Sequence, residues 1–204
     1  MTSRRALLQF GTVTAVMATI GGGIVAGCSR SAPVFTGLDI TGADFGKVLH
    51  LRSPDGVVRT LDSFKGRYVM LFFGFTQCPD VCPTALARAV DVRKLLGADG
   101  DNIQVVFVTI DPERDTPELL RQYTAAFDPG FLGLSGSLSE TEEAAKEFRI
   151  FYKKIPSGSS YTMDHTAITY VFDTEGRIRL ALKHEQTASQ CAQDMRSLMA
   201  SHTI

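Results

Sequence analysis

Residues 68–86 read YVMLFFGFTQCPDVCPTAL, and this stretch decides the fold. Its first eight residues form an unbroken apolar run, which is typical of a strand buried on both faces in the middle of a parallel sheet. From residue 83 to residue 96 the apolar side chains recur at helical spacing, which predicts a helix. The stretch therefore predicts a buried strand, a loop that carries Cys78 and Cys82, and a helix.

The rest of the chain continues this alternation of strands and helices. Further strands are predicted at 103–110, 167–172 and 177–182, and further helices at 116–127, 139–150 and 187–199. Thr116 and Ser139 are expected to cap the first two of these helices. A Ser-Pro-Asp-Gly turn at 53–56 predicts a short hairpin that joins 47–52 to 57–61. We therefore expect an α/β sandwich with a central mixed sheet flanked by helices and an extra N-terminal hairpin.

Length and charge limit the classes of protein to which this chain can belong. The chain has 204 residues, 44% of them hydrophobic, which suits one globular domain with a short appendage. Its formal net charge of −1 indicates no nucleic-acid partner. We expect the folded domain to span 45–202, preceded by a tether at 28–44 that is rich in small and polar residues.

The N-terminal segment resembles an export signal. Arg4 and Arg5 precede an uncharged stretch that ends in Val-Ala-Gly-Cys28, so residues 1–27 read as a twin-arginine-like signal with a lipobox and Cys28 as the lipidated residue. The alternative is a retained membrane anchor, because 22 uncharged residues are long enough to span a bilayer. Both interpretations place the domain outside the cytoplasm, on the periplasmic side and attached to a membrane. Thiols are normally oxidised to disulfides there.

Cys78 and Cys82 lie where functional sites of open α/β folds gather, at the carboxyl end of a strand and the amino end of a helix. Free N–H groups and the helix dipole stabilise a thiolate at this place. The prolines that follow both cysteines stiffen the loop. The alternative interpretation is a structural disulfide or a pair of buried thiols.

His165 is the candidate third ligand. It lies 83 residues after Cys82 and directly before the strand predicted at 167–172, a junction that faces the entry of the first helix. Two thiolates and one imidazole suit Cu(I), with Cu(II) also possible. Zn²⁺ prefers a fourth ligand, for which Asp80 is the obvious candidate.

Several other residues are candidates for parts of a site. Asp164 could orient the imidazole, and Met163 is a reserve ligand whose simpler role is packing. Acid–base catalysis by the Asp-Pro-Glu-Arg-Asp segment at 111–115 is conceivable, but a structural or partner-facing role fits better beside two cysteines. The remaining assignments are a packing role or an intermolecular bridge for Cys191, ordinary surface positions for His50, His184 and His202, and a solvated basic patch for Tyr152, Lys153 and Lys154.

Four segments resemble the Sco/SenC family of copper-handling proteins, which have a thioredoxin-like fold. They are FFGFTQCPDVCPTAL at 72–86, VTIDPERDTP at 108–117, FLGLSG at 131–136 and MDHTAITYVFD at 163–173. The resemblance implies a membrane-tethered copper chaperone that serves the dinuclear copper site of cytochrome c oxidase, with the oxidase subunit that holds this site as its partner. It also implies that one copper ion per chain binds to Cys78, Cys82 and His165.

The resemblance leaves a second activity open. Some members of the family reduce the disulfide of the target's copper site, so Cys78 and Cys82 could act as a redox-active pair in a thiol-disulfide reductase, with other copper chaperones or thiol reductants as further partners. A thioredoxin oxidoreductase carries a proline before its third core strand, where this chain has His165-Thr166-Ala167. That difference favours metal binding, and with it a metallochaperone rather than an enzyme.

Overall fold

The computed structural model describes residues 34–202, and its centre is a six-stranded mixed sheet. Strands β4 (Tyr68–Gly74) and β5 (Ile103–Thr109) run parallel in the middle of this sheet, and every residue of both is buried. The strand order is β1-β10-β9-β4-β5-β6. The outer members are β1 (Leu38–Asp39), β10 (Ile178–Lys183), β9 (Ile168–Phe172) and β6 (Leu132–Leu134). The predicted buried strands and mixed sheet are confirmed.

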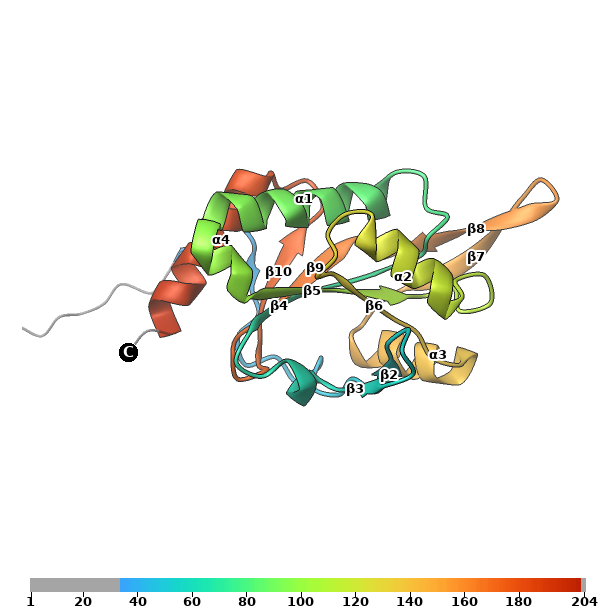
Figure 1. Ribbon diagram of the computed structural model, residues 1–204, viewed down its shortest axis with the longest axis horizontal. Coiled ribbons are helices and arrows are strands. Elements are labelled where there is room, and N and C mark those ends of the chain that lie inside the picture. Colours follow the sequence, from blue (N-terminus) through green and yellow to red (C-terminus); the bar gives the residue numbers. More distant parts are fainter. Residues whose placement is uncertain (1–33, 203–204) are drawn as a thin grey trace, which may run out of the picture. The chain divides into compact units, whose positions relative to one another are not determined.

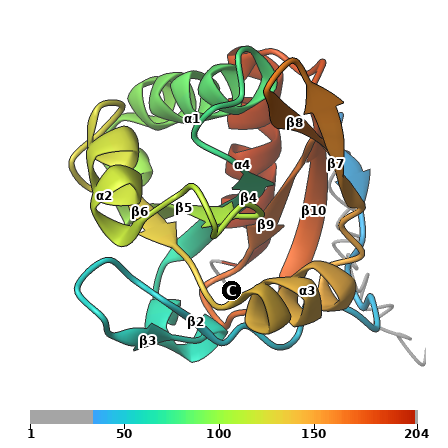
Figure 2. The same ribbon diagram turned by 90° about the vertical axis from the view of Figure 1, so that its right-hand side faces the viewer.

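Helices cover both faces of the sheet. Helices α1 (Val81–Leu96) and α4 (Ala188–His202) pack side by side on one face, and α2 (Pro117–Ala125) lies beside β6. Helix α3 (Leu138–Glu147) and the short hairpin of β2 (Leu51–Arg52) and β3 (Val58–Arg59) lie on the other face (Figure 2). Two short 3₁₀ helices, Leu61–Phe64 and Gly97–Asn102, precede β4 and β5. None of the helices in this part of the chain is both long and apolar enough to cross a membrane.

Helix caps show where local prediction succeeded and failed. Thr116 caps α2 as predicted, since its side chain accepts the N–H of Leu119 at 3.2 Å. The cap predicted at Ser139 was wrong, because α3 is capped by Ser137. Glu140 explains this choice: its carboxylate accepts the N–H of Ser137 at 2.7 Å while its own N–H binds the Ser137 hydroxyl, and this reciprocal pair requires a cap three residues before the acid.

The fold begins earlier than the tether prediction allows. Strand β1 lies within the segment assigned to the tether, and it pairs antiparallel with β10. Just before it, the N–H groups of Thr36 and Gly37 donate to the carboxylate of Asp194 at 2.7 and 2.8 Å. The predicted export signal and Cys28 lie outside the described residues.

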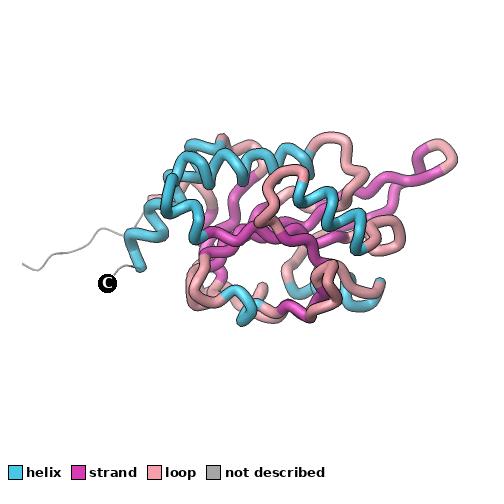
Figure 3. Tube along the Cα trace, in the orientation of Figure 1, coloured by secondary structure: helices cyan, strands magenta, loops and turns pink. Residues whose placement is uncertain are grey.

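A second hairpin was missed in the sequence. Strands β7 (Tyr152–Ser157) and β8 (Ser160–His165) pair only with each other and form a two-stranded sheet of their own. The hairpin extends away from the main sheet at the end where β4 meets α1 (Figures 1 and 3). Its exposed residues lack a clear apolar alternation, so they read as a loop with a basic patch.

Candidate metal centre

The two cysteines are positioned by the end of β4 and the start of α1. Cys82 is completely buried, whereas Cys78, on the loop between the two elements, is half-buried. Gly74 at the end of β4 allows Cys82 to lie so deep, because a Cβ atom on Gly74 would be 2.7 Å from the Cys82 sulfur and 2.8 Å from the ring of Phe107. This role of Gly74 was not predicted from the sequence.

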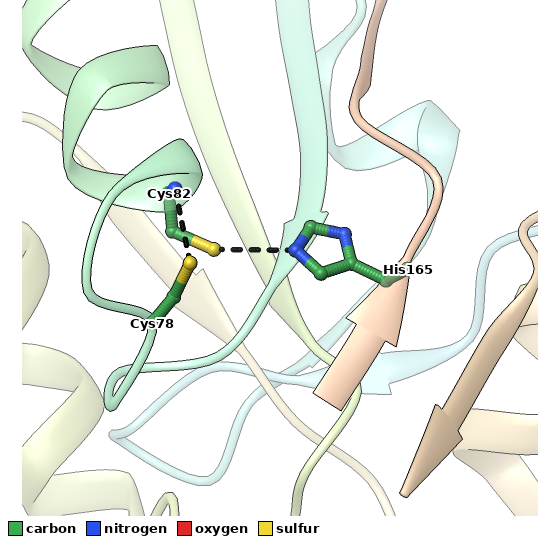
Figure 4. Close-up of side chains that lie close together, drawn as sticks. All are labelled: Cys78, Cys82 and His165. Carbon is green, nitrogen blue, oxygen red and sulfur yellow. Dashed lines mark hydrogen bonds between the residues drawn. The ribbon is translucent and has the colours of Figure 1, made fainter. Parts of the chain in front are cut away.

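His165 reaches the cysteines from the last position of β8. Its ring lies edge-on to Phe72 and Phe75, with 5.9 Å between ring centroids in each case. Its Nε2 atom is 3.5 Å from the Cys82 sulfur (Figure 4), and its Nδ1 atom is 3.0 Å from the carbonyl oxygen of Thr166. Because a carbonyl only accepts hydrogen bonds, Nδ1 is assigned the proton, and the lone pair of Nε2 faces the thiols.

The three side chains form a set that could hold a metal ion. The sulfurs of Cys78 and Cys82 and a ring nitrogen of His165 all lie within 4.8 Å of one another. Both cysteines are free thiols rather than a disulfide. Two soft sulfurs and one imidazole form a donor set that suits copper, since thiolates favour Cu(I) and imidazole is also a good copper ligand.

The two sulfurs differ in how easily they ionise. A hydrogen bond from Cys82 lowers the pKa of Cys78 to about 3. Burial opposes this effect, and contacts with His165 and with the backbone N–H groups of Asp80 and Cys82 add to it. The same hydrogen bond, together with burial, raises the pKa of Cys82 far above that of an ordinary thiol. Cys78 therefore carries the first negative charge of the pair.

Three further predicted positions lie around this set without joining it. Asp80 is exposed at the start of α1, where its carboxylate accepts a hydrogen bond from Thr84 at 3.4 Å. Asp164 is also exposed, because it neighbours His165 in β8 and adjacent strand residues point to opposite faces. The carbonyl oxygen of Thr166, rather than Asp164, orients the imidazole. Met163 is buried, in agreement with a packing role.

The Asp-Pro-Glu-Arg-Asp segment shapes the site, as the structural interpretation predicted. Asp115 is buried and accepts three hydrogen bonds: one from the N–H of Thr76 at 3.0 Å, and one each from the hydroxyls of Thr76 and Thr109 at 2.6 Å. Burial raises the pKa of Asp115, and these hydrogen bonds partly offset that rise. Thr76 begins the loop that carries Cys78, so Asp115 fixes this loop to the end of β5.

Among the residues that the structure describes, Cys191, His50 and His184 lie apart from the ligand set. Cys191 is completely buried in α4, where burial raises its pKa, so it packs in the core rather than forming a bridge to another molecule. His50 is exposed, and His184 is half-buried in the loop before α4. His202 ends α4.

Comparison with known proteins identifies relatives of this chain. The SCO1/SenC family profile matches residues 39–200. An SCO2-like protein of Rickettsia conorii is 36% identical over 70% of this chain and 68% of its own length. The structure of Bradyrhizobium japonicum ScoI with copper bound is 38% identical with a TM-score of 0.68, covering 74% of this chain and 98% of that one.

A third relative links the fold to an assembly process. BsSco, described as a member of the Sco family of cytochrome c oxidase assembly proteins with a disulfide switch, is 27% identical with a TM-score of 0.62. The match covers 84% of this chain and 99% of that protein. These structural matches confirm the predicted thioredoxin-like fold.

Proposed function

The chain belongs to the SCO1/SenC family, and from this premise we propose that it binds one copper ion through Cys78, Cys82 and His165 and transfers it to the dinuclear copper site of cytochrome c oxidase. The convergence of three donor atoms within 4.8 Å, from segments 83 residues apart, carries this proposal. The copper-bound ScoI of Bradyrhizobium japonicum supports the choice of metal.

The unequal exposure of the ligands suits transfer rather than storage. Copper moves between proteins by exchange of ligands, so part of the site has to be open to an incoming donor. Cys78 and His165 are each partly exposed, and only Cys82 is completely buried. The low pKa of Cys78 keeps a thiolate available for the metal at neutral pH.

We place the protein on the outer side of a membrane. Support comes from the sequence of residues 1–28, which reads as an export signal that ends at a lipidated Cys28 or as a retained anchor. A tethered chaperone would meet the copper-site subunit of the oxidase at the membrane surface. Labelling of Cys28 with a radioactive fatty acid would test the lipid anchor, and a Cys28→Ala variant that is still labelled would contradict it.

The metal content and spectrum of the reduced, copper-loaded protein test the copper site. We expect one copper per chain and a thiolate-to-Cu(II) charge-transfer band that is lost in Cys78→Ala, Cys82→Ala and His165→Ala. Copper that binds one-to-one in the absence of both cysteines would refute the proposed site.

A second candidate function is reduction of a disulfide in the partner. The asymmetry of the two thiols favours it: Cys78 is accessible with a low pKa, and Cys82 is a buried thiol beside it. The Cys78 thiolate would attack the partner's disulfide and form a mixed disulfide. Cys82, on losing its proton, would then displace Cys78 from the partner, leaving a Cys78–Cys82 disulfide and a reduced partner.

His165 separates the two functions. Thiol-disulfide exchange needs only the sulfurs, so His165→Ala should keep reductase activity while it lowers copper delivery if the protein is a chaperone. The measurement is oxidase copper content in cells together with reduction of a disulfide peptide from the copper-site subunit. Normal oxidase copper with His165→Ala would make the reductase the main function.

A further inference from the structure

The position of His165 depends on contacts from outside its own hairpin. Strands β7 and β8 bond only to each other, and Met163 is the only buried residue of the two strands. The hairpin extends beyond the main sheet (Figure 1). A ligand on such an element stays in place only if side chains from the rest of the fold hold the hairpin.

Arg114 makes the connection between the hairpin and the cysteine loop. Its Nη1 atom donates to the carbonyl oxygen of Tyr161 in β8 at 2.7 Å and to the side-chain oxygen of Gln77 at 3.1 Å. Gln77 directly precedes Cys78. The guanidinium also lies 3.7 Å from the centre of the Tyr161 ring, a stacking contact that only a planar cation makes well.

Asp111 holds the guanidinium in this orientation. The carboxylate of Asp111 is almost fully buried and accepts the Nε–H of Arg114 at 2.5 Å. Its other oxygen accepts the hydroxyl of Tyr161 at 2.8 Å. An ion pair between Lys154 and Glu113 adds a second connection from the hairpin to the same loop. Arg114, Asp111 and Tyr161 therefore form one network, which we call the hairpin clamp.

We propose that Arg114 is a positioning residue: through the hairpin clamp it holds β8, and with it the imidazole of His165, against the two thiols. The clamp itself stands on the geometry above, and its consequence for the metal rests on the proposed function. Two thiolates are sufficient ligands for Cu(I), whereas the nitrogen donor adds to the affinity for Cu(II). Arg114 would thus set the preference of the site for Cu(II) over Cu(I) without touching either form.

Hydrogen exchange in the metal-free, reduced protein tests the clamp. Arg114→Lys keeps the charge but loses the planar fork, and Tyr161→Phe removes only the bond to Asp111. Backbone amides of the hairpin, and the Thr166 N–H that donates to Phe151 next to it, should exchange about tenfold faster in Arg114→Lys. Tyr161→Phe should give a smaller increase. Amides of β4 and β5 serve as the internal reference.

Copper affinity tests the consequence. Loss of such an outer contact typically costs about 10–100-fold in metal affinity, and we expect this loss for Cu(II) in Arg114→Lys, with Cu(I) changed less than about threefold. Arg121→Lys, at an exposed ion pair with Glu118 on α2, is the matched control and should change neither.

Unchanged exchange in the hairpin, or equal acceleration throughout the sheet, would overturn the clamp. Equal losses for Cu(II) and Cu(I) would overturn its effect on the metal. A wild-type protein that binds no copper would refute the proposed function, and the metal-free exchange would still decide the clamp.

Discussion

The two halves of the metal centre are held by opposite kinds of structure. The cysteine half follows β4, which is buried along its length between β5 and β9. The histidine half is carried by the β7–β8 hairpin, which has little burial and depends on the hairpin clamp. The fold itself therefore fixes the sulfurs, whereas a few polar contacts of the hairpin fix the imidazole. Changes in the two halves should therefore have different effects.

The largest effect is expected from loss of a sulfur. Cys82→Ser should lower the affinity for both Cu(I) and Cu(II) about 1,000-fold or more, which corresponds to about 4 kcal/mol, because a hydroxyl is a poor ligand for a soft metal. Competition with a chelator of known affinity measures both oxidation states. Cys191→Ala is the control, since this cysteine is buried in α4 and is not part of the ligand set. Affinity within tenfold of wild type would show that Cys82 is not a ligand.

Loss of the imidazole should affect one oxidation state. We expect His165→Ala to weaken Cu(II) about 100-fold and Cu(I) less than about tenfold, since two thiolates satisfy Cu(I). The same competition assay applies, with the exposed His50→Ala as control. Equal weakening of both states would contradict the division between the two halves.

A methyl group behind the buried sulfur should disturb the rigid half. In Gly74→Ala the new Cβ would be 2.7 Å from the Cys82 sulfur, and such overpacking costs about 1–3 kcal/mol of unfolding free energy. Urea denaturation measures this change. Gly56→Ala is a useful comparison, because Gly56 has a φ of +82° but no atom within 4 Å of the added Cβ. Both variants should lose stability, and only Gly74→Ala should lose copper binding. Copper binding that persists in Gly74→Ala would contradict a rigidly held Cys82 sulfur.

The smallest change is expected in the reactivity of Cys78 with pH. Its pKa of about 3 means that the thiolate is already formed at pH 5, so the alkylation rate of the metal-free protein should vary less than about threefold from pH 5 to pH 8. A thiol of ordinary pKa, near 8.5, gains about tenfold per pH unit over the same range. The measurement is iodoacetamide labelling followed by mass mapping of the Cys78 peptide, with the urea-unfolded protein as reference. A tenfold rise per unit in the folded protein would contradict the assigned thiolate.

The same contrast explains which features could be read from the sequence. The buried strands and the helix that starts near Cys82 are encoded locally, in apolar runs and helical spacing, and they were found to within two residues. The ligand set was predicted from residue types and the family resemblance, and the structure brings Cys78, Cys82 and His165 together.

The hairpin clamp was hidden because it depends on contacts between distant parts of the chain. Arg114 reaches Tyr161 across 47 residues and Gln77 across 37, and no local pattern reports such contacts. The β7–β8 hairpin is polar and contains Pro156, so it lacks the apolar alternation of a half-buried strand. The cap at Ser137 was missed although its signal, an acid three residues later, is local.

If the protein transfers copper as proposed, the complete burial of Cys82 determines the order in which the ligands are exchanged. An incoming donor from the partner can approach only where solvent reaches the ligands, on the side of Cys78 and His165. In the proposed transfer, Cys82 would therefore be the last ligand to release copper. Copper release in this proposed transfer would be directional, because the partner's donors would have to reach the ion from the open side before Cys82 releases it.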